Sequence, residues 1–158
     1  MQLTITQTLL YGIPENFVYA LFCLTLLNHK LVLNKIFIIA VIQTAIYFFV
    51  RALPLPFGLH TLFGIFTLSF LLKRYTGNNF SKIFVVVLIT FLTNGIIELL
   101  NITTLGAVWG KETVFENENF SLLVGFFQLI YLFAVTFLVI MIKKKKQKKG
   151  TFEVPEQS

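Results

Sequence analysis

Apolar residues gather in long runs along this chain, and the polar residues between the runs are few and clustered. A helix needs about 20 predominantly apolar residues to cross the hydrocarbon core of a bilayer. The pattern predicts helices in five runs of roughly this length, at about 3–27, 36–53, 57–72, 83–108 and 120–142. The predicted fold class is therefore all-α, a polytopic transmembrane helical bundle of about five spans within residues 1–142.

Proline and glycine interrupt the apolar pattern at two places. Pro54 and Pro56 lack an amide donor and disfavour helix in the residue before them, so the second predicted helix ends there. Gly58 then permits the turn into the third helix. The first run is broken at residues 12–15, which read Gly-Ile-Pro-Glu. Whether residues 3–27 span the membrane or lie partly at its interface stays open, and a four-span variant is the alternative.

Basic residues are unevenly distributed between the predicted loops. With the N-terminus outside, the inner loops and the C-terminal tail carry eleven Lys and Arg residues, and the outer loops carry two. Cytoplasmic loops are the ones enriched in Lys and Arg. The sequence therefore predicts an outside N-terminus and a basic cytoplasmic tail over residues 143–158. Lysine outnumbers arginine eleven to two, as in proteins of AT-rich bacterial genomes, which indicates the bacterial cytoplasmic membrane.

Composition argues against several functional classes. Hydrophobic residues make up 56% of the chain, 13% are charged and the mean hydropathy is +0.82, whereas about a quarter of a soluble domain is charged. The net charge of +6 comes from one lysine run, so no basic face for nucleic acid exists elsewhere. The chain has one Cys, no Asp and no hydrolase, zinc or phosphate-loop motif. We expect no enzymatic activity, no cofactor, no metal and no nucleic-acid partner.

Four ionisable residues lie inside or at the ends of the predicted spans: Glu15, Arg51, His60 and Glu98. A charge in a membrane segment is costly and is a functional candidate by default. Glu98 lies about 22 Å along the fourth helix, in its outer third. Arg51 and His60 flank the outer turn, so all four can share one outer layer in which Arg51 pairs with Glu98. This layer is either the polar floor of a ligand pocket or a structural ion pair with snorkelling ends.

Two further groups of polar residues have mainly structural interpretations. Mid-span amides commonly form hydrogen bonds between helices, and we expect this of Gln43, Asn94 and Gln128. A lysine run directly after a span anchors the helix end at an anionic membrane surface. This role is predicted for Lys143, Lys144, Lys145, Lys146, Lys148 and Lys149.

A family resemblance joins several of these residues. Residues 49–61, Phe-Val-Arg-Ala-Leu-Pro-Leu-Pro-Phe-Gly-Leu-His-Thr, resemble the turn between the second and third helices of a membrane sensor domain found in Firmicutes. That domain precedes the cytoplasmic part of sensor histidine kinases of the accessory-gene-regulator, GHKL-ATPase type. The opening Leu-Tyr-Gly-Ile-Pro-Glu and Glu98 are similar to the same pattern. The resemblance implies a sensor of an extracytoplasmic or intramembrane signal, often a peptide, here without the kinase part.

Three functional hypotheses follow from these features. The first is a non-enzymatic signalling or regulatory membrane protein that acts through a separate cytoplasmic partner such as a histidine kinase. The second is a small substrate-binding transport subunit that joins separate ATPases. The third is an immunity or accessory protein against a membrane-active peptide. The lipid bilayer is a partner in all three, and a peptide ligand or self-association into a homo-oligomer stays open.

Overall fold

The computed structural model describes residues 11–53, 58–109 and 118–150, and within these ranges the protein is helical and without strands. Each predicted apolar run overlaps one helix, so the all-α prediction is confirmed. The helices are α2 (Ile13–Leu26), α3 (Leu33–Ala52), α4 (Leu59–Thr76), α5 (Phe80–Trp109) and α7 (Glu118–Gly150). The predicted turn at Pro54 and Pro56, and most of the predicted outer loop between α5 and α7, lie outside the described residues.

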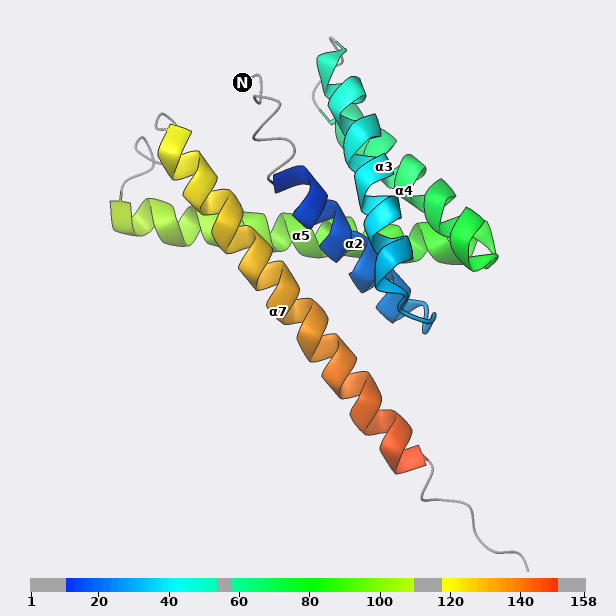
Figure 1. Ribbon diagram of the computed structural model, residues 1–158. Helices are drawn as coiled ribbons and strands as arrows, with labels where there is room; N and C mark the ends of the chain where they lie inside the picture. Colours follow the sequence, from blue (N-terminus) through cyan, green and yellow to red (C-terminus); the bar gives the residue numbers. More distant parts are fainter. Residues whose placement is uncertain (1–10, 54–57, 110–117, 151–158) are drawn as a thin grey trace, which may run out of the picture.

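The helices are arranged around α2, the shortest of them (Figure 1). α2 packs against α3, α5 and α7, while α4 packs against α3 and α5. α3 and α4 lie side by side and run in opposite directions (Figure 1). α5 passes behind α2 and α7 at a steep angle, and the C-terminal half of α7 extends beyond the other helices (Figure 1). α2 and α5 therefore each contact three other helices, and α2, the shorter of the two, is the first in the described chain.

α2 forms the centre of the packed core. The helix begins at Ile13, and Pro14 lies in its first turn, where the fixed φ suits the helix and the missing amide has no partner to lose. Asn16 and every residue from 18 to 25 are buried. With 3.6 residues per turn, such a continuous buried stretch covers all faces of a helix, so neighbouring helices enclose α2 on every side.

α3 and α4 approach each other closely at Gly64. A Cβ atom at this position would collide with the ring of Tyr47 on α3. Beside this contact, the Nε2 of Gln43 donates a 3.0 Å hydrogen bond to the carbonyl oxygen of Gly64. Small residues allow helix backbones to approach in this way in membrane bundles. Any side chain at position 64 would therefore require Tyr47 or the two helices to shift.

The surface of the described helices is largely apolar, and the interior, although mostly apolar as well, includes polar side chains. Less than a third of each of the long apolar stretches in α3, α5 and α7 is buried. Fully buried positions, by contrast, include polar side chains: Gln43, Ser69, Thr90 and Thr136. Ser69 and Thr136 satisfy their hydroxyls by donating to carbonyls one turn back, at 2.7 and 2.8 Å. Apolar exposure on this scale is typical of a surface that contacts other apolar material rather than water.

Three of the described helices are long and apolar enough to cross a membrane, namely the stretches 33–50, 80–105 and 125–145. α2 has 14 residues, about 21 Å of helix, which is short for a full crossing. α4 has 18 residues, but its last turn contains Lys73 and Arg74. The membrane character of the fold thus rests on α3, α5 and α7, and the count of five spans stays a prediction.

Candidate functional site

A hydrogen bond between two ionisable side chains lies in the first two turns of α2. The hydroxyl of Tyr19 donates to Oε1 of Glu15 at 2.6 Å. These residues are four positions apart, a spacing that places both on one face of a helix. Tyr19 is only 5% exposed, and its ring packs against Phe91 of α5 with centroids 5.2 Å apart. The phenol is therefore held in the core and directs its polar end at the carboxylate.

Two more ionisable residues from other helices lie near this pair. Tyr47 of α3 and Glu98 of α5 are both close enough to Tyr19 to interact with it electrostatically. Glu15 and Tyr19 of α2, Tyr47 and Glu98 are called here the acid–phenol cluster. Three helices thus bring two carboxylates and two phenols into one region of the bundle.

Asn16 links this end of α2 to α3. Its Nδ2 donates to the carbonyl of Gly12 at 2.9 Å and to the hydroxyl of Thr44 at 3.0 Å. The Thr44 hydroxyl in turn donates to the carbonyl of Ala40 at 2.8 Å. Both hydrogens of the Asn16 amide are used, so the residue fixes α2 against α3 beside the acid–phenol cluster.

The four ionisable residues singled out in the sequence have different positions in the structure. Glu15 is partly buried, and Glu98 is exposed on α5. Glu15 accepts the hydrogen bond from Tyr19, whereas Glu98 acts on Tyr19 through its charge alone. Arg51 belongs to the last turn of α3, but its side chain lies outside the described residues, so the predicted pair with Glu98 stays a prediction. His60 is half-buried in the first turn of α4, and among the described residues its buried Nδ1 has no hydrogen-bond partner.

The three mid-span amides all make contacts between helices. Nε2 of Gln128 on α7 donates to Oδ1 of Asn94 on α5 at 3.0 Å. Gln43 of α3 reaches the carbonyl of Gly64 on α4, while its own Oε1 is buried without a partner in the described part of the chain. The first contact ties α7 to α5, and the second ties α3 to α4.

The contact between Asn94 and Gln128 predicts a measurable coupling. Alanine at both positions should cost less than the sum of the single replacements, by about 0.6 kcal/mol, a typical value for hydrogen bonds between helices in membranes. A double-mutant cycle on unfolding in detergent micelles measures this term. Thr93, whose hydroxyl bonds within its own helix to Ile89, is the control partner for Gln128 and should show no coupling. Equal coupling in both cycles would contradict the contact.

Two polar contacts of the core were not singled out in the sequence. Sγ of Cys23, completely buried on α2, lies 3.1 Å from the hydroxyl of Thr90 on α5. Tyr19 was also missed, although its four-residue spacing from Glu15 is a signal that the sequence contains. Of the lysine run, Lys144 and Lys145 are exposed, whereas Lys143 is partly buried; the side chains of Lys146, Lys148 and Lys149 lie outside the described residues.

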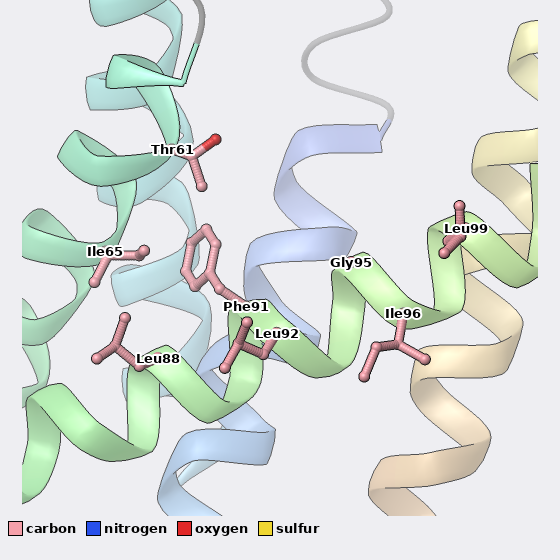
Figure 2. Close-up of a pocket in the computed structure, with 8 residues that line it drawn as sticks. All are labelled: Thr61, Ile65, Leu88, Phe91, Leu92, Gly95, Ile96 and Leu99. Carbon is pink, nitrogen blue, oxygen red and sulfur yellow. The ribbon is translucent and has the colours of Figure 1, made fainter.

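A groove of about 360 Å³ lies between α4 and α5 (Figure 2). Its lining is almost wholly apolar, with Ile65 from α4 and Phe91, Leu92 and Ile96 among the residues from α5. The ring of Phe91 points toward α4, and the hydroxyl of Thr61 points away from the groove (Figure 2). The groove offers no charged group for recognition, so the acid–phenol cluster is the stronger candidate for a polar ligand.

Among the described residues no group of three or more His, Cys, Asp or Glu side chains is placed to hold a metal ion. The fold and the site together define a helical protein with three helices fit to cross a membrane and a polar cluster on its central helix. No family model matches the chain, and no curated protein or solved structure is significantly similar to it.

Proposed function

We propose that this protein is an integral membrane signalling or regulatory protein. In this proposal it resides in a bacterial cytoplasmic membrane with five spans, its N-terminus outside and its C-terminus in the cytoplasm. It senses an extracytoplasmic or membrane-embedded signal and acts through a separate cytoplasmic partner. The observation that carries the proposal is the acid–phenol cluster on the enclosed helix α2, centred on the hydrogen bond between Tyr19 and Glu15.

The physical case starts from the cost of a carboxylate among apolar helices. An ionisable side chain in a membrane segment is expensive, and such residues mark ligand or ion sites. Tyr19 donates to Glu15 and thereby orients it, while Glu98 adds a second carboxylate within electrostatic range. Carboxylates and aromatic rings together attract a cationic group, through charge and through the ring faces. The cluster therefore suits an ammonium or guanidinium group, such as a peptide can present.

The resemblance to accessory-gene-regulator-type sensor domains supports the same proposal. Of the residues that carry it, Glu15 and Glu98 both belong to the acid–phenol cluster, and His60 lies in the first turn of α4. A cytoplasmic histidine kinase is accordingly the partner that we propose. The basic end of α7, which begins at Lys143, is the segment that such a partner would meet first.

Purification of the tagged protein from its native membranes in mild detergent, with mass spectrometry of what is retained, tests the proposal. An unrelated multi-span protein with the same tag, expressed at the same level, is the control. We expect a histidine kinase or a response regulator to be enriched over this control. Enrichment of transport ATPases would overturn the signalling proposal and make the acid–phenol cluster a substrate site. Retention of neither class would also contradict an action through a stable cytoplasmic partner.

A further inference from the structure

Lys143, the first residue of the lysine run, differs from its neighbours in what it contacts. Its Nζ donates to the carbonyls of Thr25 at 2.7 Å and Leu26 at 3.1 Å, and to Oδ1 of Asn28 at 2.8 Å. A lysine ammonium has three N–H groups and no acceptor. All three hydrogens therefore have a partner at the C-terminal end of α2, more than a hundred residues earlier in the chain.

The end of α2 has a reason to attract this cation. The amides of Asn28 and His29 bond back to the carbonyls of Thr25 and Leu24, at 3.2 and 3.0 Å, and Asn28 has a left-handed backbone with φ of 55°. This is a Schellman ending, with Asn in the position that glycine usually occupies. The negative end of the helix dipole is favourably placed beside a cation. α2 has no basic residue in its own last turn, so Lys143 of α7 supplies that charge.

We infer that Lys143 is a latch that holds the start of the C-terminal tail to the end of α2. The lysine run then has two roles rather than one. Lys143 faces into the bundle and fixes where α7 leaves it, whereas Lys144 and Lys145 are exposed and free to meet anionic headgroups or a partner. Because α2 also carries Glu15 and Tyr19, one rigid helix connects the acid–phenol cluster to the tail. The latch itself does not depend on the proposed sensing function.

Hydrogen–deuterium exchange of the full chain in detergent micelles tests the latch. Lys143→Met and Lys144→Met each remove one charge from the run and keep a long side chain, so they are matched variants. We expect amide exchange over residues 27–29 to rise at least about tenfold in Lys143→Met. The end of α2 should fray once it loses the three hydrogen bonds that the Lys143 ammonium donates to it. Exchange in Lys144→Met should equal that of the wild type. Equal rates in both variants would overturn the proposal and leave the run as an anchor by charge alone.

A second variant tests the latch from the α2 side and leaves the lysine run intact. Asn28→Gly keeps the left-handed backbone, which glycine adopts without strain, and removes one of the three acceptors. We expect a several-fold rise in exchange at residues 143–147, the first residues of the lysine run, where the sequence is unchanged. Unaltered exchange there would overturn the latch, even if Lys143→Met could not be obtained in a folded form.

Discussion

Leucine at position 64 is expected to destabilise the bundle by about 2 kcal/mol, within the usual range of 1–3 kcal/mol for overpacking a well-packed interior. Gly64 is buried, and a Cβ atom there would meet the ring of Tyr47 directly. A leucine side chain needs more room than one carbon, so α3 and α4 must separate or Tyr47 must change its rotamer. Either response also disturbs the hydrogen bond from Gln43 to the Gly64 carbonyl and the phenol near Tyr19.

Gly95 of α5 is the matched control for this replacement. No atom lies within 4 Å of a Cβ built at this glycine, which lies on the groove between α4 and α5 (Figure 2). Both replacements gain the same helix propensity, because leucine ranks close to alanine and glycine is about 0.8–1.0 kcal/mol less favourable than alanine. The difference between them in free energy of unfolding therefore isolates the packing cost. Denaturation in detergent micelles, followed by circular dichroism, measures it, and similar values for the two variants would contradict the close approach at Gly64.

Hydropathy predicts where the helices lie, but it does not predict the end of α7. The observed α3 and α5 agree with the predicted runs within a few residues, because a membrane span is a long apolar run. α7 continues to Gly150, whereas the apolar run ends near residue 142. Lysine is a good helix former, so a basic segment ends the apolar pattern and not the helix.

The neighbours of each polar side chain could not be predicted from the sequence. The spacing of Glu15 and Tyr19 predicts that they share one face of a helix. Tyr47 and Glu98, however, reach the same region only because α3 and α5 pack against α2. The sequence likewise identifies Gln43 as a candidate for a contact between helices. Its acceptor is a backbone carbonyl at a glycine, and no residue type marks such a partner.

The central position of α2 is the feature of the fold that is hardest to predict from the sequence. Its segment is as apolar as the others, and the break at residues 12–15 makes it the weakest candidate for a span. Yet it is the helix with a continuous buried stretch, over residues 18–25, while much of the longer, more regular helices is left exposed. In an apolar solvent, hydropathy does not distinguish an interior helix from a peripheral one, because both are apolar all round.

Alanine at position 24 tests that central position with the largest effect that we expect from one truncation. Leu24 is fully buried in the last turn of α2 and is among the largest side chains of the core. Removing three carbons there should cost about 2–5 kcal/mol, the range for buried leucines. Within a membrane the loss is mainly of van der Waals contacts around the cavity, since water does not drive the packing of helices.

Replacement of Leu138 of α7 by alanine provides the comparison, because Leu138 is 58% exposed and the same side-chain atoms are removed. Its replacement by alanine should alter the free energy of unfolding by no more than about 0.5 kcal/mol, as is usual for surface positions. Both variants are measured in the same micelles with the same denaturant. A large difference means that α2 is enclosed in the folded protein, with the acid–phenol cluster and the Lys143 latch at its two ends. Equal, small effects would mean that α2 faces lipid, and Glu15 would then need another partner to explain its place in the chain.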